Sequence, residues 1–143
     1  IDLVPTLLEM LGEPVPRELP GCGREAVLRG EETLADNDVF IQHNGIGDRD
    51  LTSAASSHTM SSQRVQQLNL LNTAPWRSVV TADRWKLTLC AADQGELFDL
   101  NADPLEITNL FDLPQHRDRV RWMAARLRLW QAETGDSAPL PGV

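Results

Sequence analysis

Short apolar runs separated by turn residues dominate the second half of this chain. They predict four strands, over residues 39–41, 78–81, 85–90 and 96–100. Asp83-Arg84 is suited to a tight connection between the second and third strands, and Asp93-Gln94-Gly95 carries the turn residues expected between the third and fourth. Because these connections are short, we expect one antiparallel sheet with a covered face.

The apolar spacing changes to that of a helix over residues 113–133. Asp112 is expected to be the N-cap, with Gln115 three positions later, and Gly135 is expected to end the helix. One stripe of side chains is expected to pack on the sheet: Val120, Met123, Ala124, Leu127 and Trp130. A second ridge lies on the opposite side, between rows of arginines, and predicts a contact with a region outside the chain. It consists of Trp122, Ala125 and Leu129.

The beginning of the chain is almost entirely apolar. A helix is predicted over residues 2–11, capped by Asp2 and ended by Gly12. Its apolar side chains point in nearly every direction, so this helix needs cover on more than one side. Residues 13–37 are rich in Pro and Gly and are interpreted as a linker, with one short helical turn at residues 24–29.

Together these patterns predict an α+β fold, in which a small four-stranded antiparallel sheet is packed by a C-terminal helix. The expected organisation is an N-terminal helix in residues 1–12, a linker in 13–37, a sheet-and-helix domain in 38–136 and a tail in 137–143. A long loop is expected at residues 45–75, and loops of that length are usually functional or disordered.

Composition narrows the possible partners. The chain has 143 residues, of which 41% are hydrophobic, and a net charge of -8. This length suits one domain with a real core, while the negative charge disfavours non-specific binding to nucleic acid or anionic lipid. No apolar run approaches the length of about 20 residues that spans a membrane, so no membrane association is expected. Cys22 and Cys90 lie far apart without a C-x-x-C pair, which predicts neither a disulfide framework nor a zinc site.

Candidate chemistry concentrates after the first predicted strand. His43 and Asn44 stand at the strand's end, from which polar side chains can reach a neighbouring cleft, and we interpret them as substrate-binding residues at a cleft rim. The alternative is an ordinary strand end with an Asn-Gly turn. Asp48 and Asp50, with His43 and His58, could in principle hold a hard cation, but a polar loop is the favoured interpretation. No Ser-His-Asp arrangement is predicted.

Three segments carry a family resemblance. Residues 96–110 read ELFDLNADPLEITNL and resemble the C-terminal signature of the sulfatase family, E-L-[YF]-D-L-x-x-D-P-x-E-x-x-N-L, at every fixed position. Residues 76–87 look like the family's R-x-x-R-T-x-x-[YW]-K-L strand pair, and residues 1–8 look like its D-[IL]-x-P-T-[IL]-L helix. Three matches in the family's order make a chance similarity improbable.

The signature is expected to be structural. Asp103-Pro104 fixes a turn, because proline presets its φ angle, while Asp99, Glu106 and Asn109 are expected to bind nearby backbone donors. Arg77 in the preceding strand pair is interpreted as a sheet or interface residue, and both Arg77 and Arg84 are free to pair with acidic neighbours.

The resemblance covers the C-terminal region of sulfatases only. It implies that residues 1–12 are the last helix of an α/β catalytic domain that this chain lacks. Family chemistry needs a C-x-[PA]-x-R segment whose cysteine or serine becomes formylglycine, and neither Cys22, followed by Gly-Arg-Glu, nor Cys90, followed by Ala-Ala-Asp, fits it. The family's divalent cation, commonly calcium, is likewise implied for the catalytic domain. No catalytic or metal-binding residue is therefore assigned to this chain.

The resemblance implies the C-terminal portion of a sulfatase-like hydrolase, inactive alone, that completes the fold and lines the substrate cleft. Its implied partners are the missing catalytic domain and a sulfate-ester substrate. A phosphonate monoester or phosphodiester hydrolase of the same superfamily is one alternative, and a non-catalytic module of sheet and helix is another. Substrate, compartment, oligomeric state and metal identity stay open.

Overall fold

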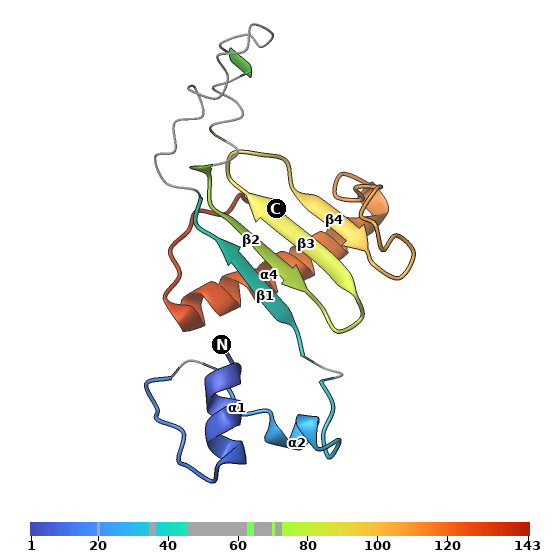
Figure 1. Ribbon diagram of the computed structural model, residues 1–143. Helices are drawn as coiled ribbons and strands as arrows, with labels where there is room; N and C mark the ends of the chain where they lie inside the picture. The colour runs from blue at the N-terminus through green and yellow to red at the C-terminus, as the bar shows by residue number, and fades with distance from the viewer. Residues whose placement is uncertain (20, 35–36, 46–62, 65–69, 71–72) are drawn as a thin grey trace, which may run out of the picture. The chain divides into compact units, whose positions relative to one another are not determined.

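A computed structural model describes residues 1–19, 21–34, 37–45, 63–64, 70 and 73–143 of the chain. The chain divides into two compact units, Ile1–Asn37 and Asp38–Val143 (Figure 1). Among the described residues, no helix combines the length and the apolar character needed to cross a membrane.

The first unit contains α1 (Leu3–Met10) and the short α2 (Glu25–Leu28). Asp2 occupies the N-cap position of α1, but its carboxylate makes no capping bond, which corrects the predicted role. Instead its two oxygens accept hydrogen bonds from the Cys22 backbone N–H (2.9 Å) and the Arg24 Nε (3.0 Å). Both hydrogen bonds lower the pKa of Asp2, and the bond from Cys22 has the larger effect. The carboxylate thus joins the beginning of α1 to the segment before α2.

Most of the apolar surface of α1 is uncovered, and Leu3 is 71% exposed. Only Pro5 and Thr6 of this helix are buried. Within the Ile1–Asn37 unit, this helix therefore lacks the cover that its apolar sequence requires.

The second unit is built on four strands: β1 (Val39–His43), β2 (Trp76–Val80), β3 (Trp85–Cys90) and β4 (Glu96–Asp99). They lie in the order β1-β2-β3-β4, and each neighbouring pair is antiparallel (Figure 1). Strand β1 extends two residues beyond the prediction, to His43, and β2 begins two residues earlier, at Trp76. The predicted α+β class and antiparallel sheet are confirmed.

The connection from β2 to β3 is tight, as predicted. Arg84 adopts a left-handed φ of 65° in this turn, and its backbone N–H donates to the Thr81 carbonyl at 2.8 Å. The Thr81 hydroxyl donates to the Asp83 carboxylate at 2.6 Å and is the main cause that lowers the pKa of Asp83, with Arg119 adding to the effect.

The long helix α4 (Arg117–Thr134) lies across one face of the sheet (Figure 1). It follows a 3₁₀ turn, η2 (Pro114–His116), and its N-cap residue is His116, so the prediction of Asp112 as N-cap is wrong. The reason is Pro114, which keeps Leu113 extended at φ -74° and ψ 124°. Gly135 ends the helix in the left-handed conformation, at φ 69°, as predicted.

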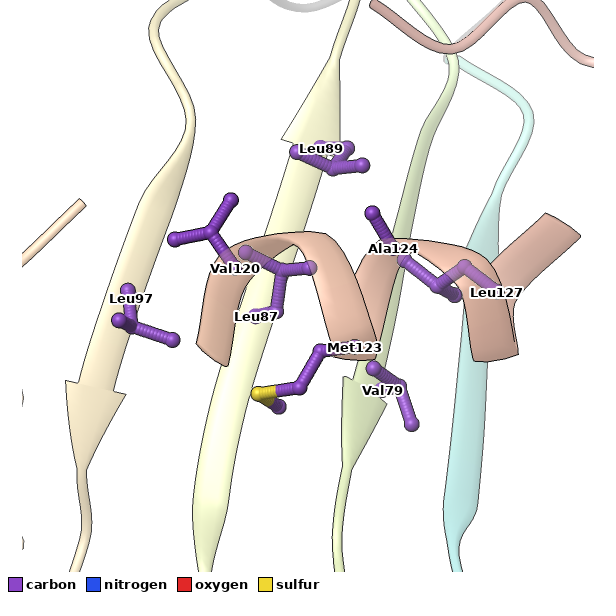
Figure 2. Close-up of a cluster of buried hydrophobic side chains, with 8 residues drawn as sticks. All are labelled: Val79, Leu87, Leu89, Leu97, Val120, Met123, Ala124 and Leu127. Carbon is purple, nitrogen blue, oxygen red and sulfur yellow. The ribbon is translucent and has the colours of Figure 1, made fainter. Parts of the chain in front are cut away.

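The core lies between α4 and the sheet. Figure 2 shows the α4 side chains against those of the strands. The fully or nearly fully buried members are Val79, Leu87, Leu89, Leu97, Val120, Met123, Ala124 and Leu127. The predicted α4 stripe is therefore confirmed, and Trp130 completes it by stacking on Phe40 with ring centroids 5.4 Å apart. Burying one such large apolar side chain contributes about 2 kcal/mol, which holds the helix on this face.

The second ridge of α4 lies on the other side of the helix. Trp122 is 45% exposed, and its ring lies under the guanidinium groups of Arg119 and Arg126, at 5.4 and 4.8 Å. These arginines are in turn paired with Asp83 and Asp38. The ridge thus has contacts within its own unit, and a contact with a region outside the chain stays a prediction.

The signature segment after β4 is held by its polar side chains. Asn109 Oδ1 accepts from the backbone N–H groups of Leu97 and Phe111, and its Nδ2 donates to the Gly95 carbonyl, all at 3.0 Å. Asp99 Oδ1 accepts from the Asn101 N–H at 3.0 Å. These bonds agree with the predicted binding of backbone donors.

Glu106 differs from that prediction. Its carboxylate pairs with Lys86 Nζ of β3 at 2.6 Å, and its own φ is left-handed, at 55°. The Asp103-Pro104 turn is closed by Asp103 Oδ2, which accepts from the Thr108 N–H at 2.8 Å. That hydrogen bond is the main cause that lowers the pKa of Asp103.

Candidate functional site

The two predicted rim residues lie together at the end of β1. Asn44 is exposed, while His43 is half-buried and stacks on Trp76 of β2, with ring centroids 5.3 Å apart and planes 21° apart. This stacking follows from the register, because His43 and Trp76 are paired residues on neighbouring antiparallel strands. The indole therefore limits the orientations that are open to the imidazole.

The buried Arg77 fixes this strand end through hydrogen bonds. Arg77 of β2 is 2% exposed and uses its guanidinium as a donor to four groups. Its NH1 donates to the His43 carbonyl (2.7 Å) and the Trp76 carbonyl (2.9 Å), and its NH2 donates to Asn44 Oδ1 (2.8 Å). The arginine thereby fixes the backbone at His43 and the side chain of Asn44 at the same time.

The fourth group is the carboxylate that neutralises the arginine. Asp136 accepts from Arg77 Nε at 2.8 Å and from NH2 at 2.6 Å, a bidentate pair. Gln131 Nε2 also donates to Asp136 Oδ2, at 2.7 Å. These hydrogen bonds hold the pKa of Asp136 far below its usual value, and the bonds from Arg77 have the largest effect. The Arg77–Asp136 pair therefore connects the end of β1 to the residue that follows the Gly135 cap of α4.

Gly45 shows how closely the chain returns to this point. Its φ is +82°, and a Cβ placed there would lie 2.0 Å from the carbonyl oxygen of Thr73. Only glycine fits such an approach without displacing backbone. Residues 45 and 73, which lie near the two ends of the segment predicted as a loop (45–75), thus approach each other closely.

The sheet face opposite α4 carries a hollow of about 300 Å³ beside the strand end. Its lining includes Trp76, Ser78, Thr88 and Glu96. The hydroxyls of Ser78 and Thr88 bond to each other at 2.5 Å, so the buried Ser78 hydroxyl has a hydrogen-bond partner. Trp76 contributes both to this hollow and to the stack with His43.

The groups that the family resemblance implies do not fit the described residues. Among them, no three His, Cys, Asp or Glu side chains gather as a metal-binding group. Both cysteines are free, Cys22 exposed and Cys90 buried, and neither lies in a segment suited to formylglycine. Asp48, Asp50 and His58 of the loop candidate lie outside the described residues. We therefore derive no reaction step through a metal or a formylglycine.

Comparison with known proteins identifies the relatives. The chain is 56% identical over 59 residues to choline-sulfatase of Rhizobium meliloti (strain 1021), which covers 38% of this chain and 12% of that protein. Its fold matches the crystal structure of a sulfatase from Bacteroides thetaiotaomicron VPI-5482 with a TM-score of 0.68 and 26% identity, over 94% of this chain and 25% of that one. The chain is related to the sulfatases.

Two further solved structures share this fold. A 2-O GAG sulfatase matches with the same TM-score, 0.68, the same 26% identity and the same coverage. A protein solved with its substrate D-glucosamine-2-N,6-O-disulfate has the same fold at 22% identity and a TM-score of 0.68, over 96% of this chain and 24% of that one. No model of a known protein family matches the chain.

The match is to the C-terminal region of the sulfatases. The chain spans about an eighth of the length of choline-sulfatase and about a quarter of the solved structures. At the level of the family, these relatives are hydrolases.

The sequence indicated part of this site. It singled out His43 and Asn44 and noted that Arg77 was free to pair with an acidic neighbour, and the structure places all three together. It missed Asp136 and the position of the Arg77–Asp136 pair at the strand end. The available signal was the single charged residue of β2, which needs a partner when it is buried but does not say which one.

Proposed function

We propose that this chain is the C-terminal portion of a longer sulfatase-like hydrolase of sulfuric esters. In this proposal it completes the fold of the parent protein and lines one side of the substrate cleft, where His43 and Asn44 contact the substrate at the rim. A preceding catalytic domain supplies the formylglycine and the divalent cation.

The observation that carries the proposal is the agreement of two matches to one family. The local identity of 56% to choline-sulfatase and the fold match over 94% of the chain both point to sulfatases. The exposed apolar surface of α1 supports a neighbouring domain, because Leu3, Leu7 and Met10 are all exposed and a helix of this composition is normally covered.

The exposed position of Asn44 supports the rim contact. The Asn44 side chain is fixed by a hydrogen bond from the buried Arg77 and is exposed to solvent. A side chain that is already fixed can meet a ligand without rearranging, which lowers the entropic cost of binding. His43, restrained by the indole of Trp76, has the same property.

The test uses the parent protein, expressed with its upstream coding sequence and assayed with 4-nitrophenyl sulfate. We expect hydrolysis of this sulfate ester in preference to 4-nitrophenyl phenylphosphonate and bis(4-nitrophenyl) phosphate. His43→Ala and Asn44→Ala are each expected to raise KM severalfold with little change in kcat. A preference for either phosphorus ester would replace the sulfatase proposal with the phosphonate or phosphodiester alternative, and unchanged KM in both variants would exclude the rim contact.

A further inference from the structure

The hydrogen bond from Arg77 to Asn44 decides which end of the Asn44 amide is available. A guanidinium has only donors, so the atom that meets Arg77 NH2 at 2.8 Å must be the amide oxygen. The reverse orientation would place an N–H donor of Asn44 against an N–H donor of Arg77. The amide nitrogen is consequently the other end of the group.

The amide nitrogen has no partner within the part of the chain that the structure describes. Asn44 itself is exposed, whereas Arg77 is 2% exposed. Asn44 therefore presents two N–H donors, and one of the two lone pairs of its amide oxygen is already occupied by Arg77.

The buried network makes this orientation costly to reverse. Rotating the Asn44 amide by half a turn would remove one acceptor from a buried guanidinium and set two donors against each other. The remaining donors of Arg77 are engaged by Asp136 and by the carbonyls of His43 and Trp76, so no substitute acceptor is available among these groups. The charge of Arg77 is balanced by Asp136 and does not itself attract a ligand.

We infer that Asn44 donates hydrogen bonds to an oxyanion through its amide N–H groups, and that Arg77 is the positioning residue that sets this orientation. This inference rests on the proposed function and specifies it: the Asn44 amide nitrogen meets an oxygen of the sulfate ester and not the cationic part of a substrate. The two N–H groups cannot bind an ammonium group, because both partners would be donors.

Asn44→Asp separates this role from a purely structural one. The substitution keeps the shape of the side chain and gives Arg77 a carboxylate, so the melting temperature is expected to stay the same or to rise. It also replaces two donors with an acceptor that repels sulfate. Since a hydrogen bond to a charged group contributes about tenfold or more in affinity, we expect KM for 4-nitrophenyl sulfate to rise at least tenfold, with kcat nearly unchanged.

Two variants serve as comparisons in the same full-length parent. Asn44→Ala removes the donors without adding repulsion, and its KM should lie between those of the wild type and Asn44→Asp. Asn101→Asp adds the same charge at an exposed asparagine of the turn after β4, where Asn101 Nδ2 donates to the Asp83 carbonyl, and it should leave KM unchanged.

The outcomes distinguish this inference from the proposed function. If Asn44→Ala raises KM but Asn44→Asp does not, the rim contact stands and the donor assignment is overturned. If neither variant changes KM, the rim contact fails and the inference fails with it.

If the parent does not hydrolyse sulfate esters at all, the proposed function fails, and a binding measurement then decides the inference. The side-chain NH₂ resonances of the 143-residue chain are followed by NMR during titration with sodium methyl sulfate, against sodium chloride at equal ionic strength. We expect the Asn44 resonances to shift and the Asn101 resonances to stay, while an unmoved Asn44 pair would overturn the inference.

Discussion

At the scale of single residues, the Arg77–Asp136 pair is the feature with the largest consequence. Arg77 is almost fully buried, and the Asp136 side chain is only 13% exposed, so both charges have left bulk water. Such a pair gives little net stability compared with apolar residues, but removing one partner leaves the other charge buried without compensation. The position of His43 and Asn44 depends on it.

Asp136→Asn is therefore expected to destabilise the Asp38–Val143 unit by roughly 3 kcal/mol at pH 7. The sign with pH follows from the lowered pKa of Asp136: its stabilisation is complete above the carboxyl's ordinary value of 3.8 and is lost as the pH falls toward the depressed value. The difference between wild type and variant should thus stay constant from pH 7 to pH 5 and narrow below about pH 4. Urea unfolding followed by tryptophan fluorescence measures it.

Asp118→Asn provides the matched control for this prediction. The Asp118 side chain is 99% exposed and lies 3.5 Å from Arg121, so its loss should change the free energy of unfolding by less than about 0.5 kcal/mol. Equal effects of the two substitutions would contradict the importance of the buried pair.

At the scale of elements, the segment after β4 shows why a family signature can lie outside the chemistry. Asn109 supplies an acceptor to two backbone N–H groups and a donor to one carbonyl, and so replaces the hydrogen bonds that a further strand would have made. Gly95 is required at the same place, because a Cβ there would lie 2.2 Å from the ring of Phe111. The segment thus fixes the path from the sheet to α4.

Asn109→Ala is expected to lower the free energy of unfolding by about 2 to 3 kcal/mol, because it leaves partly buried backbone groups without partners. Asn109→Asp should cost less, since a carboxylate still accepts from Leu97 and Phe111 and loses only the donation to Gly95. Asn101→Ala, which removes one exposed bond, is the control and should cost less than about 1 kcal/mol. The melting temperatures of the three variants can be measured by circular dichroism. Equal melting temperatures would contradict the prediction.

At the scale of the whole molecule, the described residues form a scaffold with a proposed binding edge, and the chemistry is proposed to lie in another domain. The Asp38–Val143 unit has its own core between α4 and the sheet. The Ile1–Asn37 unit instead exposes most of the apolar residues of α1. A chain of this kind is expected to fold and to bind without turning over substrate.

The purified 143-residue chain should therefore show no hydrolysis of 4-nitrophenyl sulfate above the buffer rate, at a concentration at which the parent protein is readily active. Circular dichroism confirms that the chain is folded in the same sample. Turnover that scales with the concentration of the chain would contradict the proposal that the catalytic groups lie elsewhere.

Local patterns were sufficient for the elements of the sheet domain. The apolar runs, the turn residues and the stripe from Val120 to Leu127 predicted four antiparallel strands and a covering helix, because alternation and helical spacing follow directly from backbone geometry. The helix start was wrong by several residues, since Asp112 was favoured over the stronger restriction that Pro114 places on Leu113.

The sequence by itself determined the fold class, the family resemblance and the position of His43 and Asn44 at a strand end, because each of these depends on neighbouring residues. Tertiary structure alone decided that Asp136 is the partner of Arg77, that Asp2 binds Cys22 and Arg24, and that Glu106 pairs with Lys86. A side chain pairs with whichever group the fold brings within about 3 Å. For Arg77 that group is 59 positions away in the chain, where no local pattern reaches.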